Sequence, residues 1–266
     1  MSLRRCLSSL GCPELSLDAA FALAERHGIE GLELRALGGT LDLAEYFRTH
    51  YGAPARLAAH LVDSRVRIVA LNSSLRLAGG TAAERDQLAL LATWADASGV
   101  AWLRVFDGGK AADPVEFAQA GESLNWWRTL RRERGWRVDI MVETHDSLFT
   151  TDSILRFTAA FPGTAILWDS HHTWRKGGED PATTWRAVRA RVTHVHVKDS
   201  IGVASARHPY TYVLPGDGEF PMATLVAALR ADKFEGPVSL EWEKQWHPYL
   251  PSLEEALATA ATRKWW

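Results

Sequence analysis

The strongest constraint on this chain's fold is an eightfold alternation of a short apolar segment with a longer amphipathic one. The apolar segments are predicted strands, at residues 4–10, 31–36, 66–72, 102–107, 137–144, 165–169, 192–199 and 237–243. Strands that alternate with helices indicate a parallel sheet, and eight such units in about 250 residues indicate a closed barrel. We therefore predict an α/β fold, a single (β/α)8 TIM barrel, as one domain over residues 1–266.

Local signals at the predicted helix starts agree with this arrangement. Thr81 with Glu84, and Ser252 with Glu255, have the spacing of a capping box. An open doubly wound sheet would use the same elements and is the alternative. However, no Gly-x-Gly-x-x-Gly sequence follows the first strand, so a dinucleotide-binding sheet lacks its main support.

The composition, with 47% hydrophobic and 23% charged residues among 266, is typical of a globular protein. The formal net charge of −2 offers no basic excess for a nucleic-acid partner, and the basic run at 128–137 is expected to be a solvated helix face. No apolar run approaches the ~18 residues of a membrane helix, and no secretory signal is visible, so we expect no membrane partner. Cys6 and Cys12 alone make no disulfide framework, which fits the cytoplasm.

Side chains that can bind a metal stand at the ends of the fifth to eighth predicted strands. The four sequences are Glu143-Thr144-His145, Asp169-Ser170-His171-His172, His194-Val195-His196-Val197-Lys198 and Glu241-Trp242-Glu243. In a TIM barrel the carboxyl ends of the strands form the active-site mouth. Because buried carboxylates are costly unless they are paired or bind a cation, four such strand ends suggest one shared cause.

Strand alternation and spacing strengthen this hypothesis. Residues two apart share a face of a strand, which groups Glu143 with His145, His196 with His194 and Lys198, and Glu241 with Glu243. Taken singly, each of these side chains has an ordinary explanation as a solvated loop residue or a hydrogen-bonded core residue. Taken together, Glu143, Asp169 and His196 follow one another at 26 and 27 residues, close to one βα unit each.

Three carboxylates and one imidazole form a mainly oxygen-donor set, with no thiolate. Such a set suits Mn²⁺, Mg²⁺ or Co²⁺, and Zn²⁺ is an alternative. Glu241 follows His196 by 45 residues, which leaves room for an inserted loop at residues 200–215.

These motifs resemble those of the sugar phosphate isomerase/epimerase superfamily, whose members share a xylose isomerase-like barrel and include keto-sugar epimerases, inosose-processing enzymes and endonuclease IV. The resemblance covers nearly the whole chain. It rests on Glu33, Glu143-Thr144-His145, Asp169-x-x-His172, His194-Val-His196-Val-Lys198-Asp199, Gly216-Asp-Gly218-Glu219 and Gly236-Pro-Val-Ser-Leu-Glu241.

The resemblance implies a divalent metal, with Mn²⁺ preferred, held by Glu143, Asp169, His196 and Glu241. It also implies that Glu143 and Glu241 are catalytic and flank the substrate. One removes a proton beside a carbonyl, and the other returns a proton on the opposite face of the enediolate. His172 is expected beside the metal, in contact with substrate oxygen. Further candidates for substrate binding are Glu33, His145, Lys198, Arg207 and Glu243, with a surface ion pair as the alternative for Lys198 and Arg207.

Several functions stay open at this point. A metal-dependent isomerase or epimerase acting on a keto-sugar or related polyol is the first, and a lyase that dehydrates a keto-cyclitol through the same enolate is the second. Gly202 stands near the place where epimerases of this kind carry an arginine, and the Asp-x-His of the endonuclease branch is missing before Gly216. The missing Asp-x-His and the net charge of −2 disfavour a nuclease, and the presence of all four metal-ligand residues disfavours a non-catalytic sugar-binding barrel.

The expected partner is a small sugar or polyol, preferably without phosphate. The helical exterior and Trp265-Trp266 are compatible with a homodimer. Twelve tryptophans are unusual for this length, and we expect most of them to pack between barrel and helices, with Trp168 and Trp242 facing outward.

Overall fold

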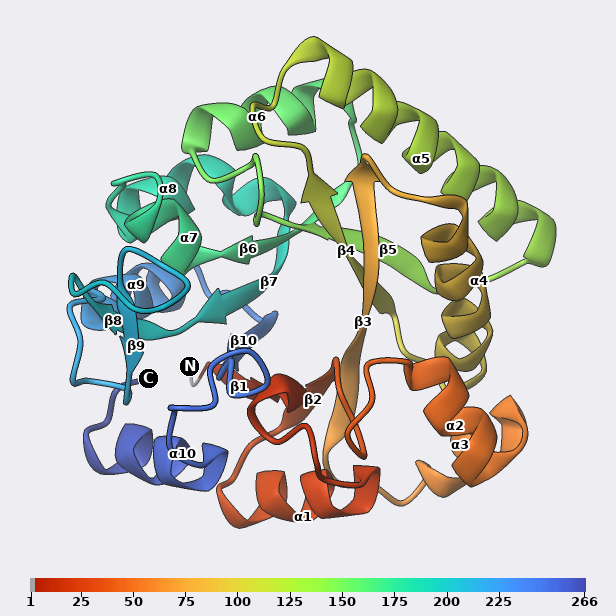
Figure 1. Ribbon diagram of the computed structural model, residues 1–266, viewed down its shortest axis with the longest axis horizontal. Coiled ribbons are helices and arrows are strands. Elements are labelled where there is room, and N and C mark those ends of the chain that lie inside the picture. The colour runs from red at the N-terminus through yellow and green to blue at the C-terminus, as the bar shows by residue number, and fades with distance from the viewer. Residues whose placement is uncertain (1–2) are drawn as a thin grey trace.

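Eight parallel strands close into a barrel in the computed structural model, which describes residues 3–266 (Figure 1). The order around the barrel is β1-β10-β7-β6-β5-β4-β3-β2. These strands are β1 Arg4–Ser8, β2 Gly31–Leu34, β3 Arg67–Ala78, β4 Trp102–Gly108, β5 Asp139–Glu143, β6 Ala165–Asp169, β7 Val192–Val197 and β10 Pro237–Leu240. The predicted TIM barrel is thus confirmed, and the open sheet is excluded by the pairing of β1 with both β2 and β10.

Helices surround the barrel on its outer side (Figure 1). They are α1 Leu17–Arg26, α2 Leu43–Tyr51, α3 Pro54–His60, α4 Ala82–Ala97, α5 Pro114–Arg134, α6 Thr151–Ala160, α7 Ser170–Arg175, α8 Pro181–Val188, α9 Met222–Ala231 and α10 Leu253–Thr262, with short 3₁₀ turns η1 Ser9–Gly11 and η2 Arg189–Arg191. Thr81 and Glu84 form both bonds of the predicted capping box. At Ser252 only one of the two bonds forms, in which the backbone N–H of Glu255 donates to Ser252 Oγ.

The prediction of the seventh strand as residues 192–199 is wrong at its carboxyl end. β7 stops at Val197, and Asp199–Ile201 forms a separate strand, β8, that pairs antiparallel with β9, Thr211–Val213. The resulting hairpin stands beside the barrel strands (Figure 1). The chain leaves the barrel because the carboxylate of Asp199 accepts backbone N–H groups from Gly216, Gly218 and Phe220, which ties the inserted loop back to its start.

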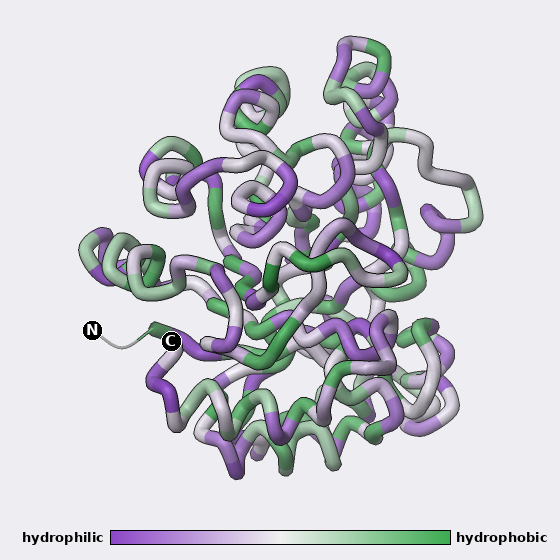
Figure 2. The backbone as a smooth tube through the Cα atoms, turned by 60° about the vertical axis from the view of Figure 1, so that its left-hand side comes forward, coloured by the Kyte–Doolittle hydropathy of each residue, from purple (hydrophilic) through white to green (hydrophobic). Residues whose placement is uncertain are grey.

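Two apolar layers form the core. A small cluster of Ala70, Met141, Ala165 and Leu167 is separate from the main cluster, which includes the strands' other faces and the helices. Trp168 stacks on Trp185 of α8, which confirms its predicted outward orientation. Figure 2 shows polar and apolar colour alternating along the outer helices, as expected when one helix face packs on the barrel and the other meets solvent. No helix among residues 3–266 is long and apolar enough to cross a membrane.

Candidate metal centre and active-site cavity

The structure brings the four predicted metal ligands together at the carboxyl end of the barrel. Glu143 ends β5, Asp169 ends β6, His196 lies in β7, and Glu241 directly follows β10. One donor atom from each lies within 4.8 Å of the corresponding atoms of the other three, and all four residues are buried. Residues up to 98 positions apart in sequence therefore form one compact donor set.

Three buried donor atoms in this set lack a hydrogen bond of acceptable geometry: Glu143 Oε2, Asp169 Oδ2 and His196 Nδ1. Their contacts are with charged side chains rather than with well-aligned hydrogen-bond partners. A divalent cation would satisfy such atoms, and oxygen donors with one imidazole suit it chemically. The residues present therefore fit a metal ion.

Two buried cations also contact the set. Arg104 of β4 places Nε 3.1 Å from Glu143 Oε2, and Lys198 places Nζ 2.9 Å from Asp169 Oδ2. Burial would raise the pKa of Glu143, but the charge of Arg104 and the contact with His196 hold that pKa below its usual value. Both effects favour an ionised Glu143 at neutral pH.

Glu241 is held ionised in a similar way. Burial opposes its charge, but His196 and Lys198 lower its pKa well below the usual range. The two predicted catalytic carboxyls are thus both bases rather than acids in the metal-free protein. Their strands are separated by β6 and β7 in the barrel order, so they reach the cavity from different directions.

Lys198 is only 1% exposed, which rules out the surface ion pair considered above. Its ammonium contacts Asp169 and Glu241, and lies 2.6 Å from Glu243 Oε1. Burial by itself would lower the pKa of Lys198, but these three carboxylates raise it well above the usual value. Lys198 therefore remains charged in the centre of the acidic set.

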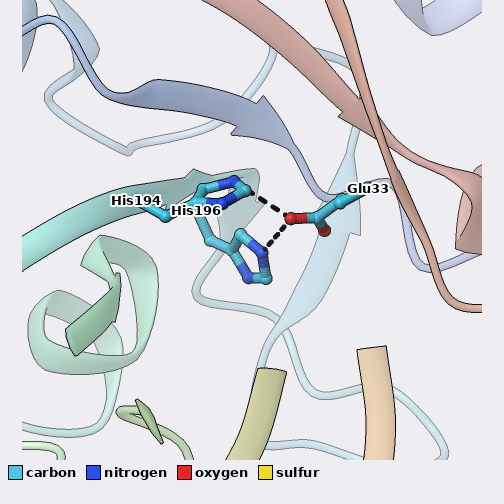
Figure 3. Close-up of side chains that lie close together, drawn as sticks. All are labelled: Glu33, His194 and His196. Carbon is cyan, nitrogen blue, oxygen red and sulfur yellow. Dashed lines mark hydrogen bonds and ion pairs between the residues drawn. The ribbon is translucent and has the colours of Figure 1, made fainter. Parts of the chain in front are cut away.

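Glu33 lies beneath His196, not in the cavity. Figure 3 shows its carboxylate facing both histidines of β7: Oε2 is 3.0 Å from His194 Nε2 and 2.9 Å from His196 Nε2. Glu33 has no exposed surface, so its position does not support the expected substrate contact. Burial would lower the pKa of His196, but Glu241 and Glu33 raise it well above the usual value, so the ring is charged in the metal-free protein. On metal binding Nδ1 would lose its proton, while Nε2–H would stay hydrogen-bonded to Glu33, as in carboxylate–histidine–metal triads.

The other predicted site residues occupy different depths. His172 of α7 is 3% exposed, and its Nδ1 lies 3.1 Å from both Asp169 Oδ2 and the carbonyl oxygen of Thr144. Burial, together with Lys176, keeps the pKa of His172 well below the usual value, so the ring is neutral. His145 is partly buried, with Nδ1 2.8 Å from Asp146. Exposed Arg207 donates to the carbonyl of Trp246, 3.0 Å away.

A cavity of about 320 Å³ opens above the donor set. Its lining residues include Arg35, Arg104, Phe106, Glu143, His145, Arg207, His208, Glu241, Glu243 and Trp246. The predicted residues Glu143, His145, Arg207, Glu241 and Glu243 are thus on the wall, whereas Glu33 and His172 are behind it. The wall is polar and charged, with one tryptophan and one phenylalanine side chain.

Sequence reasoning missed two arginines and two aspartates that shape the site. Arg104 interrupts the apolar strand Trp102–Gly108, and this charge in a buried strand was the available signal. Asp107 accepts backbone N–H groups from Asp146, Ser147 and Leu148, and so fixes the loop that follows β5. Asp199 fixes the hairpin loop as described above. Arg35 stands near the end of the predicted strand 31–36, and this charge at a strand end was the available signal.

Comparison with known proteins identifies related folds. A family model described as "Xylose isomerase-like TIM barrel" matches residues 21–266. No curated protein matches the sequence. Among solved structures, the probable 3-DHS dehydratase AsbF from Bacillus anthracis has a TM-score of 0.76 at 20% identity, covering 97% of this chain and 98% of that one.

Two further structures have the same fold. The IolI protein, described with a binding zinc atom, has a TM-score of 0.75 at 17% identity, with 98% of this chain and 96% of that chain covered. A D-tagatose 3-epimerase-like protein has a TM-score of 0.70 at 15% identity, with the same coverage of 98% and 96%. At such identities the likeness establishes the fold only.

Proposed function

The chain belongs to the xylose isomerase-like TIM-barrel family, and we propose that it is a divalent-metal-dependent isomerase or epimerase acting on a keto-sugar or related polyol. The observation that carries this proposal is the pair Glu143 and Glu241. Both are kept ionised, both line one cavity, and both belong to a four-residue donor set that fits a cation. We propose Mn²⁺ first, because three of the four donors are carboxylates.

A bound divalent cation would supply Lewis-acid stabilisation of the negative charge that develops on substrate oxygen. The chain's own residues would move the proton. In this mechanism one of the two glutamates takes a proton from the carbon beside the carbonyl, and the substrate becomes an enediolate. For isomerisation the same glutamate returns that proton to the neighbouring carbon. For epimerisation the other glutamate, which starts ionised, first takes up a proton from solvent and then delivers it to the opposite face, and the first glutamate releases its proton to solvent.

Two cationic side chains and one carboxylate support the glutamates from around the cavity. Lys198 keeps Glu241 charged through their contact beneath the cavity wall. Arg104 keeps Glu143 charged through their 3.1 Å contact. Glu33 orients His196 from behind the wall. His172 would reach substrate oxygen only after a change of position, since it does not line the cavity.

Dehydration is a second candidate, favoured by Glu243. This side chain shares the cavity wall with Glu241, accepts a hydrogen bond from Tyr212 Oη at 3.0 Å and contacts Lys198. A proton passed through Glu243 to a β-hydroxyl would let that group leave as water, while the electrons of the enolate form the carbon–carbon double bond. This would make the protein a lyase acting on a keto-cyclitol or a related compound.

Solvent exchange in D₂O tests the proposal. Metal-loaded protein is incubated with ketoses, inososes and their acids and phosphates, and proton NMR follows the carbon-bound proton beside the carbonyl. We expect metal-dependent exchange, with product signals that distinguish epimerase, isomerase and dehydratase. E143Q and E241Q should lose exchange by a factor of about 10²–10⁴, whereas E133Q, at an exposed position of α5, should not. Near-normal exchange in E143Q or E241Q would refute the two-glutamate mechanism.

The free, buried state of both cysteines is compatible with action in the cytoplasm, which we propose as its location. A homodimer remains a proposal to be checked by light scattering.

A further inference from the structure

Arg35 is a buried guanidinium that faces the cavity without a carboxylate partner. It directly follows β2, is 6% exposed and lines the cavity wall. Its Nη2 donates to Ser74 Oγ at 2.7 Å and its Nη1 to the carbonyl oxygen of Leu41 at 3.4 Å. Both acceptors are neutral, and no ion pair among residues 3–266 involves Arg35.

A buried charge without a counter-ion is costly, and proteins seldom keep one without a use. Burial and the nearby charge of Arg104 lower the pKa of Arg35 to about 9, and the charges of Glu143 and Glu241 offset this only in part, without an ion-pair contact to either. Arg35 is still charged at neutral pH. Arg104 differs from it, because Arg104 is paired with Glu143. Arg35 therefore lacks the carboxylate contact that compensates the charge of Arg104.

The charge balance around the cavity also favours an anionic substrate. The wall carries three arginines, Arg35, Arg104 and Arg207, against three glutamates. Below the wall, Lys198 faces Asp169. These groups are balanced in the metal-free protein. Buried Glu33 and charged His196 add one further balanced pair. A bound divalent cation would displace the proton of His196 and so leave one positive charge in excess, which a neutral sugar would not compensate.

The position of Arg35 in the barrel indicates which end of a substrate it would bind. β2 lies opposite β6 in the barrel order, so Arg35 stands across the mouth from Asp169, while Glu241 follows β10, which only β1 separates from β2. A negative group held by Arg35 would thus belong to the far end of a substrate whose carbonyl end is at the donor set. The cavity of about 320 Å³ spans both.

We propose that the substrate carries an oxyanion at the end remote from its carbonyl, and that Arg35 binds this group. The assignment of the carbonyl end rests on the function proposed above. The anion is a carboxylate or a phosphate, both of which match the two-pronged donor geometry of a guanidinium. A single buried arginine favours the carboxylate, because the smaller group needs fewer donors. The substrate class is then a keto-sugar acid or a cyclic keto-acid.

Binding of unreactive polyols tests this inference without turnover. Titration calorimetry compares D-gluconate with D-glucitol, which differ only by a carboxylate against a hydroxymethyl group, and glucitol 6-phosphate provides the phosphate arm. Each is added to metal-free and Mn²⁺-loaded protein. We expect an oxyanion to bind at least about tenfold more tightly than glucitol, which corresponds to about 1.4 kcal/mol. Whichever of gluconate and glucitol 6-phosphate binds more tightly identifies the group.

Variants at Arg35 locate the bound anion. R35Q should reduce the preference for the oxyanion to less than about threefold while leaving glucitol unchanged, and R35K should retain part of it because the charge remains. R128Q, which removes an exposed arginine of α5, should behave as wild type. Urea unfolding shows whether each variant is folded. If R35Q does not fold, the reduced preference for the oxyanion is measured in R35K instead.

The outcomes separate the two proposals. A preference that survives in R35Q places the anion on the metal and overturns the inference, as does equal affinity for gluconate and glucitol, including no measurable binding of either. An Arg35-dependent preference without any D₂O exchange supports the inference and contradicts the proposed proton transfer. Exchange on neutral ketoses that is unchanged in R35Q would support the proposed proton transfer and contradict the inference about Arg35.

Discussion

At the scale of single residues, the chemistry of the candidate metal centre depends on which nitrogen of His196 is free. Glu33 contacts Nε2 at 2.9 Å. Burial would raise the pKa of Glu33, but His196 and His194 lower it well below the usual value, so the carboxylate is ionised. The imidazole therefore presents Nδ1 to Glu143 and Glu241, at 3.4 and 3.2 Å. One buried carboxylate with no access to the cavity thus sets a property of the donor set.

We predict that E33Q weakens metal binding by about 10–100-fold, because the amide can no longer hold a charge-assisted bond to Nε2. Competition with a fluorescent chelator measures the dissociation constant for Mn²⁺. E30Q, an exposed position one residue before β2, is the matched control and should bind metal as wild type does. A change below threefold in E33Q would mean that packing alone orients His196.

At the scale of elements, the loop between β9 and α9 is fastened to the start of β8 by one side chain. Asp199 accepts four backbone N–H groups, from Ser200, Gly216, Gly218 and Phe220. The glycine at 218 permits this approach: a Cβ there would lie 2.0 Å from Asp199 Oδ1. The loop that follows β9, the strand that carries Tyr212, is therefore held by a contact that excludes larger residues.

Gly218→Ala should lower the free energy of unfolding by about 1–3 kcal/mol, because the added methyl must displace Asp199 or the loop. Gly202→Ala, in the same connection, is the control: the nearest atom to its Cβ would be 3.7 Å away, and we expect a change within about 0.5 kcal/mol. Urea denaturation followed by tryptophan fluorescence measures both. Equal stabilities of the two variants would contradict this account of the loop.

The short helix α7 makes the stability sensitive to acid. His171 is fully buried, its Nε2 lies 2.8 Å from Ser200 Oγ, and burial, together with Lys198 and Arg175, lowers its pKa well below 6.5. The unfolded chain takes up a proton near pH 6.5 and the folded chain does not. This contribution to stability is therefore present above pH 6.5 and is lost as the pH falls below it.

Metal-free protein should accordingly lose up to about 1.4 kcal/mol of stability per pH unit for each such histidine below pH 6.5. Histidines whose pKa is raised, such as His145, act with the opposite sign while the unfolded chain takes up its proton near pH 6.5, and this opposition ends once both states are protonated at lower pH. Urea titrations at pH 7.0, 6.0 and 5.5 measure the slope. H171N should show a shallower slope than wild type, and an unchanged slope would assign the acid sensitivity to other groups.

At the scale of the whole molecule, the donor set joins four strands that are distant in sequence. β5, β6, β7 and β10 are contiguous in the barrel, so a cation there would connect half of its circumference. The folded chain can bind such an ion through preformed geometry, and the unfolded chain cannot. Metal binding should therefore appear as global stability.

We predict that Mn²⁺ at 100 times its dissociation constant raises the stability by about 2.7 kcal/mol, a shift of several degrees in Tm. EDTA should reverse the shift, and D169N should largely abolish it. Differential scanning calorimetry makes the measurement, with D152N, an exposed carboxylate of α6, as the control. Identical Tm values with metal and with EDTA would contradict a metal centre at these residues.

The sequence by itself determined the barrel and the four residues of the donor set. Apolar periodicity, caps and polar strand ends are local properties, and in a TIM barrel the strand ends meet at one face whatever the details of packing. The inward alternation of His194, His196 and Lys198 follows from the two-residue repeat of a strand. The end of the seventh strand does not follow from local signals. Apolar periodicity predicts a strand up to residue 199, whereas the hydrogen bond from Gly216, 17 residues later, to Asp199 cannot be recognised in the sequence.

Only the tertiary structure decided which charges meet. Glu33 was expected to touch substrate and instead lies under His196, because the closure of the barrel brings β2 across from β7. Arg35 and Arg104 became part of the site for the same reason. Ion pairing and burial depend on distances between segments far apart in the chain, and these distances are set by the closure of the barrel and the packing of its interior rather than by any local pattern.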